Sequence, residues 1–126
     1  MYTKAAQLIV NSKKTVAFTG AGISVESGVP PFRGKNGLWN KVDPSNFDIG
    51  FFNEYPRQSW EGMREIFYDL FGRVLPNPAH YALAEMEARG MLSCVVTQNI
   101  DHLHHDAGSR VVHEFHGTLK RLICTG

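Results

Sequence analysis

Three short segments of the sequence carry residue types that could bind a ligand and move a proton. The first, FTGAGISVESGVPPFRG, covers residues 18–34, the second is TQNID at 97–101, and the third is FHG at 115–117. Glycines let a ligand approach the backbone closely. Amide and carboxylate side chains bind hydroxyl and amide groups, and a histidine can act as a general base near neutral pH. This chemistry suits a phosphate-bearing ligand with a base beside it.

The glycine segment directly follows an apolar, β-branched stretch, TVAFT at 15–19. Ligands of parallel sheets bind at the carboxyl ends of strands, and a helix beginning after Gly22 would direct free N–H groups at a phosphate or pyrophosphate. The dinucleotide pattern G-x-G-x-x-G fails at Val25, and the P-loop pattern fails at Val29 and Asn36. A purely structural turn therefore stays open as the alternative.

Phe32 and Arg33 lie in the distal part of this segment, between prolines and a glycine. An arginine can pair with a phosphate or carboxylate, and a phenylalanine can cover an aromatic ring. The alternative is an aromatic side chain packed on the core beside a surface arginine. Long loops in compact domains are more often functional lids than filler.

Polar side chains at 97–101 follow the second predicted strand, where they could contact ribose hydroxyls and amides. Asn99 or Asp101 could equally be the N-cap of the next helix. His116 follows the third predicted strand, at the same edge of the sheet, and is the candidate base; a capping or core histidine is the alternative. His102, His104 and His105 are not expected to bind metal, since no two stand at i, i+4 and HExxH is absent.

Alternating strands and helices must position these segments. The pattern predicts strands at 15–19, 93–98 and 111–115, and helices at 3–13, 56–73, 79–90 and 101–107. Strands separated by helices indicate an α/β fold with a parallel sheet. The final stretch, FHGTLKRLICTG, reads as a strand-like apolar run that stops abruptly, so a fragment of a longer chain is expected.

Size and composition fit one domain of 126 residues. With 13 basic and 12 acidic residues the net charge is +1, which does not favour nucleic-acid binding. No apolar run approaches the roughly 20 residues that cross a bilayer, so no membrane partner is expected. Two cysteines, Cys94 and Cys124, make no disulfide framework, and a cytoplasmic location is the expectation.

Taken together, GAGISVESGVPPFRG, TQNID and FHG resemble the sirtuin family of NAD-dependent protein lysine deacylases, from about Val16 to Cys124. The resemblance implies an incomplete Rossmann-like parallel sheet flanked by helices, with the C-terminal half and most of a small zinc-binding module missing. A cofactor-binding loop would cover about 28–45, and a helical small-module segment about 46–75.

The family's site residues carry over to matching positions. On the phosphate and adenosine side, the cofactor NAD would contact Gly20, Ala21, Gly22, Ser24 and Glu26. Its ribose and nicotinamide would contact Gln98, Asn99, Ile100 and Asp101. The mobile loop that covers the cofactor would contain Phe32 and Arg33. His116 would be the general base, with Asn99 as a second catalytic residue. Cys124 would be the first of four zinc ligands, the others being absent.

The implied reaction transfers an acyl group from a protein lysine to ADP-ribose, giving nicotinamide and 2′-O-acyl-ADP-ribose. Acyl-lysine proteins or peptides are the implied partners. Pro31 replaces the family's usual Asp, so the role of that acid in relatives does not carry over. No Tyr-x-x-Arg is present, which favours acetyl or longer apolar acyl groups over acidic ones. We expect this segment alone to be inactive. An NAD or ADP-ribose binding module and an ADP-ribosyltransferase are the alternatives.

Overall fold

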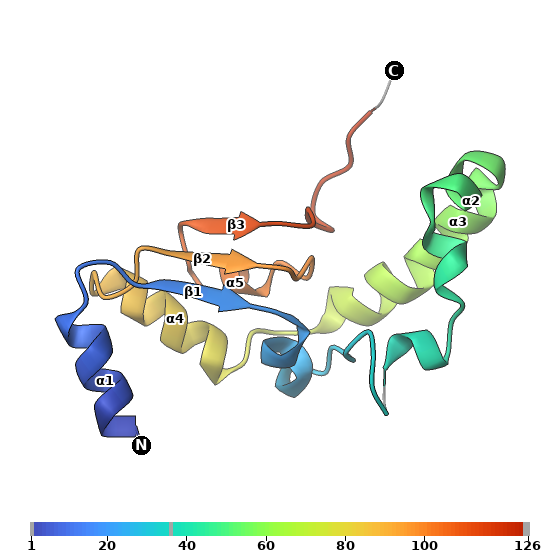
Figure 1. The fold of residues 1–126 in the computed structure, drawn as a ribbon. Helices are drawn as coiled ribbons and strands as arrows, with labels where there is room; N and C mark the ends of the chain where they lie inside the picture. Colours follow the sequence, from blue (N-terminus) through green and yellow to red (C-terminus); the bar gives the residue numbers. More distant parts are fainter. Residues whose placement is uncertain (1, 36, 125–126) are drawn as a thin grey trace.

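The computed structural model describes residues 2–35 and 37–124. Its centre is a parallel three-stranded sheet in the order β1 (Val16–Thr19), β2 (Cys94–Thr97) and β3 (Val112–Glu114) (Figure 1). The α/β prediction with a parallel sheet is confirmed. The pairing register places Thr19 opposite Thr97 and Thr97 opposite Glu114. All three strands therefore end in one row, and the segments that follow them leave from the same edge.

The connection from β1 to β2 contains most of the helices. Short 3₁₀ helices come first, then α2, α3, a π-helical turn η4, a 3₁₀ turn η5 and the longer α4: η1 (Ala21–Ser27), η2 (Leu38–Asn40), η3 (Pro44–Phe47), α2 (Ile49–Glu54), α3 (Pro56–Met63), η4 (Arg64–Leu70), η5 (Phe71–Arg73) and α4 (Pro78–Ala88). Figure 1 shows α2 and α3 projecting away from the sheet. The bounds of the helical region predicted at 56–73 are confirmed, but the region consists of α, π and 3₁₀ segments, and the separate helix α2 precedes it.

Two local signals explain those helix boundaries. The Asp48 carboxylate accepts a hydrogen bond from the Gly50 N–H, which caps α2, a helix outside the predicted region at 56–73. Pro56 occupies the first turn of α3, a position that needs no N–H donor. Asn77 caps α4 in the same way and forms a capping box with His80, whose imidazole accepts from the Asn77 N–H.

One face of the sheet is covered and the other is open. Val95 and Thr97 on β2 are almost fully buried, at 0% and 2% exposure. On this face α5 (Leu103–Asp106) contacts β1 through a hydrogen bond between Thr19 and His104. On the opposite face the side chains of the central strand are partly exposed, and Phe18 on β1 is 69% accessible. Alternation of buried and exposed positions along each strand fixes which residues face α5.

A small apolar cluster joins the glycine-rich segment to the helices. Val29, Phe71 and Leu103 are buried together, with partly buried Phe67, Val74 and Leu119 around them. These residues come from distant parts of the sequence, so the cluster holds the segment after β1, the turn η5 and helix α5 at fixed positions. About 1.5–3 kcal/mol is typical for burying each large apolar side chain.

Three sequence predictions about the chain ends need correction. The third strand is shorter than 111–115, and no strand forms at 118–124 among the described residues. That segment has no strand partner along its length, and Leu122 and Ile123 are 72% and 86% exposed. The first helix, α1 (Tyr2–Asn11), ends before residue 13 and buries none of its residues. Among the described helices, none is long and apolar enough to span a bilayer.

Candidate functional site

A buried hydrogen-bond network connects the segment after β1 to the segment after β2. The Ser24 hydroxyl donates to Asp101 Oδ2 at 2.7 Å. Asn99 Nδ2 donates to Ser24 Oγ at 3.0 Å and to the Gly20 carbonyl at 3.1 Å. Ser24 and Asn99 are 0% and 6% exposed. The two segments are 75 residues or more apart in sequence, so these bonds fix the geometry of the sheet edge.

Asp101 makes two hydrogen bonds within the chain, one to each carboxylate oxygen, while its ligand role stays a prediction. Its Oδ1 accepts from the Leu103 N–H at 3.1 Å, a local bond at the start of α5, although the N-cap position itself is occupied by His102. Its Oδ2 belongs to the network with Ser24. The side chain is only half-buried, so the carboxylate, which can accept several hydrogen bonds, keeps capacity for a ligand donor.

Two buried histidines lie behind this network, and sequence reasoning assigned a role to neither. His80 Nε2 is 3.4 Å from Ser24 Oγ, and the His80 and His104 rings are 4.9 Å apart. Burial lowers the pKa of His80, opposed by the charge of Asp101. Burial likewise lowers the pKa of His104 to about 4, helped by His80. Both imidazoles are therefore neutral near pH 7.

A signal for His80 was present in the sequence. Asparagine at 77, proline at 78 and a polar residue three positions after the cap are typical of a helix start. This pattern places His80 in the first turn of α4. In the structure that turn lies beside Ser24, at the sheet edge where the strands end. His104 was considered only as a metal ligand, and nothing in its spacing indicated burial against Thr19.

The segment after η1 brings Phe32 toward the network. The Phe32 ring packs on Trp39 with ring centroids 5.3 Å apart. Phe32 also lines a small pocket with Ala21, Val29, Phe71, Asn99, Ile100 and Asp101. Backbone bonds from Leu38 to Pro31 and from Trp39 to Phe32 close this loop. Phe32 is thus packed on an aromatic neighbour and faces the polar residues of the second segment.

A larger cavity of about 300 Å³ lies next to the small pocket. Asp101 and Phe71 line both, and further apolar lining comes from Phe67, Val74, Leu103 and Leu119. Asp101 is the carboxylate that the two pockets share, and Asp106 and Lys120 add further polar lining to the larger one. Such a combination of apolar lining and few polar groups is typical of small-molecule sites.

Several predicted site residues lie at the rim without entering the network. Gly22, Glu26, Arg33 and Gln98 are exposed. A Cβ atom added to Gly22 would meet nothing within 4 Å, so open space lies beside the backbone there. That space is what close approach of a phosphate would require.

His116 lies two residues beyond the end of β3 and is exposed. Gly117 follows with φ of 85°, and its N–H donates to the Glu114 carbonyl, which makes a tight turn. His116 lines a separate open groove with residues of β3 and with Ile123. The strand register places it on the same edge as Gly20 and Asn99, but its side chain is not in the pocket that Phe32 and Asn99 line.

The cysteines do not form a metal site by themselves. Cys94 is within β2, and Cys124 is exposed near the end of the described residues. A structural zinc site of thiolates needs four of them. The residues present do not fit such a site, so the expectation of zinc at Cys124 stays a prediction.

Comparisons with known proteins identify the protein family that this chain resembles. The family model described as "Sir2 family" matches residues 20–126. The chain is 52% identical over 122 residues to NAD-dependent protein deacylase 2 of Archaeoglobus fulgidus, covering 96% of this chain and 47% of that protein. It is 50% identical over 120 residues to NAD-dependent protein deacetylase 1 of Pyrobaculum aerophilum, covering 95% and 47%.

A solved structure supports the same conclusion. A complex of Sir2 with a p53 peptide and NAD⁺ superposes with a TM-score of 0.85 at 38% identity, covering 95% of this chain and 47% of that one. The chain therefore spans about half the length of the relatives that it matches. Since the family model covers most of the chain and the fold superposes closely on a solved member, this chain belongs to the Sir2 family.

Proposed function

We propose that this chain provides the NAD-binding part of an enzyme that removes acyl groups, acetyl above all, from lysine side chains of proteins. The observation that carries the proposal is the buried network of Ser24, Asn99 and Asp101, which joins two strand-end loops at one edge of a parallel sheet. Relatives at about 50% identity are named for this activity. When bound, NAD would supply the nicotinamide leaving group and the ribose that accepts the acyl group.

The glycine segment would hold the phosphates of NAD. Gly20, Ala21 and Gly22 begin the turn into η1, and the space beside Gly22 is open. A backbone without side chains at this point lets phosphate oxygens approach the N–H groups of the turn. Glu26, exposed on the same short helix, would face the adenosine side.

The second segment would orient the nicotinamide and its ribose. Asp101 would accept from the carboxamide N–H, because Ser24 and Leu103 hold both carboxylate oxygens in place and leave acceptor capacity free. Asn99 is fixed by its two donated bonds, and Gln98 and Ile100 flank it. Neutral His80 and His104 behind the network add no positive charge near the cationic pyridinium ring.

Phe32 and His116 would complete the site. Phe32, packed on Trp39 and facing the small pocket, would exclude water from the ribose after nicotinamide leaves. Arg33 beside it is exposed and could pair with a phosphate. His116, exposed at the same sheet edge, would take a proton from a ribose hydroxyl as general base.

Binding of NAD by the purified chain tests the first half of this proposal. Gly22→Ala adds a methyl group to open space at the rim, so the free energy of unfolding should change by less than about 1 kcal/mol, while the affinity for NAD should fall at least tenfold. Gly62→Ala is the control, because Gly62 is a helical position in α3 whose added Cβ makes only ordinary contacts. Equal NAD affinity in all three proteins would contradict the assignment.

Products of an incubation with NAD and an acetyl-lysine peptide test the second half. We expect binding without turnover, because the chain spans half the length of its relatives. If turnover occurs, mass spectrometry distinguishes 2′-O-acetyl-ADP-ribose, the product of deacetylation, from an ADP-ribosylated peptide. His116→Ala should leave NAD affinity nearly unchanged, since that side chain is proposed to move a proton and not to hold the cofactor.

A further inference from the structure

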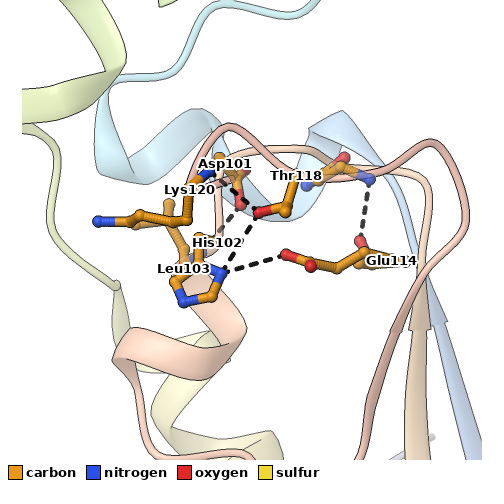
Figure 2. Close-up of polar contacts among 8 residues, drawn as sticks. Asp101, His102, Leu103, Glu114, Thr118 and Lys120 are labelled. Atoms are coloured by element: carbon orange, nitrogen blue, oxygen red, sulfur yellow. Dashed lines mark hydrogen bonds and ion pairs between the residues drawn. The ribbon is translucent and has the colours of Figure 1, made fainter. Parts of the chain in front are cut away.

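Two histidines and one glutamate converge beside the loop that carries Asp101. His102 precedes α5, His105 is within it, and Glu114 is the last residue of β3. One ligand atom from each lies within 4.8 Å of the other two. The two imidazole rings are 4.5 Å apart and inclined by 30°. Figure 2 shows His102 Nδ1 directed at Glu114 Oε1, at 3.2 Å, with Thr118 Oγ1 at 3.5 Å from the same nitrogen.

The sequence analysis did not foresee this arrangement. The histidines at 102, 104 and 105 were not expected to bind metal, because no two of them stand four residues apart on a helix. The structure brings His102 and His105 together across the start of α5, and it adds a carboxylate from a strand that no local pattern could connect to them. His104 is excluded, because its ring is buried against Thr19.

Charge and burial at this cluster favour a cation. The side chains of His102 and Glu114 are only 20% and 13% exposed. A carboxylate with so little exposure needs a hydrogen-bond donor or a cation as its partner, since an unpaired buried charge is costly. Its present partner is His102 Nδ1 at 3.2 Å, and a divalent ion held by all three side chains would meet the same need.

The donor set and its spacing suit a transition metal. Imidazole nitrogens with a carboxylate oxygen are ligands for Zn²⁺ and its neighbours, whereas Mg²⁺ and Ca²⁺ prefer oxygen ligands. Tetrahedral zinc with bonds of about 2.0–2.1 Å places its ligand atoms about 3.3 Å apart. The His102–Glu114 pair already meets that separation, and the remaining atoms need to approach by at most about 1.5 Å.

The backbone under the cluster is firmly held. His102 has a φ of 67°, a left-handed conformation in which a non-glycine residue is strained. It is kept there by Asp101, whose carboxylate accepts from the N–H of the fully buried Leu103. Strained residues that persist are characteristic of functional positions, and a fixed backbone lowers the entropy cost of gathering three ligands.

We propose that His102, His105 and Glu114 bind a divalent transition metal ion of the Zn²⁺ type, with a fourth position open to water. This site is separate from the thiolate zinc site that the family resemblance implies, and it does not depend on the proposed enzymatic function. A bound ion would link the Asp101 loop to the strand that precedes His116, so its occupancy would stiffen the edge of the candidate site.

The test measures Zn²⁺ binding by calorimetry and Co²⁺ binding by visible absorption, using the 126-residue chain with Cys124→Ser to remove the exposed thiol. His102→Gly deletes one ligand and suits the positive φ, so folding should be retained or improved. Glu114→Gln deletes the carboxylate with little change of shape. His113→Asn is the control, because His113 is exposed on the opposite face of β3 and is outside the cluster.

We expect the Cys124→Ser chain and the His113→Asn control to bind one Zn²⁺ with equal affinity. His102→Gly and Glu114→Gln should each bind at least about 100-fold more weakly, since loss of outer-shell partners alone costs 10–100-fold. Thermal unfolding without metal checks that each variant is folded. Zn²⁺ affinity that is lost with Cys124, or that is unchanged in folded His102→Gly, would overturn the proposal, leaving a simple histidine–glutamate hydrogen bond.

Discussion

Replacing Ser24 with alanine should weaken the network that joins the two strand-end loops. The Ser24 hydroxyl is fully buried and contacts three polar side chains: Asp101, Asn99 and His80. Only the first contact is irreplaceable. Asn99 Nδ2 keeps the Gly20 carbonyl as an acceptor, and the His80 contact is long at 3.4 Å.

The expected loss of free energy of unfolding follows from these hydrogen bonds. A hydrogen bond to a charged group contributes about 1.5–3 kcal/mol. Because Asp101 is half-buried and keeps the Leu103 N–H, water can replace part of the loss, and about 2 kcal/mol is the expected fall in the free energy of unfolding. In a chain of this size that lowers Tm by roughly 6–12 °C.

Urea unfolding followed by circular dichroism gives the free energy, and Ser27→Ala is the matched control. Ser27 lies in the same 3₁₀ helix and accepts from Asn77 Nδ2 at 3.0 Å, but Asn77 also donates to the Ile23 carbonyl at 2.7 Å. The control should lose less than about 1 kcal/mol. Equal costs for the two alanine variants would refute the claim that Ser24 is the central link of the network.

Three further predictions concern pH, a strand contact and a loop. The pKa of His104 is lowered by burial to about 4, against an ordinary 6.5. On acidification the unfolded chain therefore takes up this proton first. The free energy of unfolding should fall between about pH 6.5 and 4, by up to about 3 kcal/mol, and His104→Gln should flatten that slope in urea titrations. Glu87→Gln should cost about 1–3 kcal/mol, because the carboxylate accepts from the backbone N–H groups of Arg110 and Val111. Glu85→Gln, in an exposed pair with Arg89, should cost under 1 kcal/mol in the same assay. Gly37→Ala should destabilise the loop by about 1–3 kcal/mol, since a Cβ would lie 2.6 Å from the Arg33 backbone; an unchanged Tm would contradict this.

The parallel sheet and its edge could be predicted from the sequence because their signals are local. Short β-branched runs bounded by glycine or polar residues identified all three strands to within one or two residues. The convergence of Gly20, Asn99 and Asp101 then followed from a general property of parallel sheets. Helix α4 was found for the same reason, since its cap and its helix formers are contiguous.

The features that escaped prediction depend on tertiary contacts. No local sequence pattern indicates that His80 and His104 are buried, and it is the packing of α4 against α5 that buries them together. Glu114 reaches His102 because β3 lies next to β2, a relation that spacing within 101–107 cannot reveal. The C-terminal stretch was predicted as a strand on its apolar content, but apolar residues form strands only where a partner edge is available.

The register of β2 with its neighbours decides whether either site exists. Val95 pairs with Ala17 and Val112 on the covered face, while Phe18 and His113 pair with Val96 on the open face. A slip of one residue in β3 would exchange these faces. Glu114 would then leave His102, and His116 would move by one position along the rim. The register of β3 is thus specified by Val112, which pairs with the fully buried Val95 on the covered face, so an apolar side chain with no chemistry of its own determines where the carboxylate and the candidate base are placed.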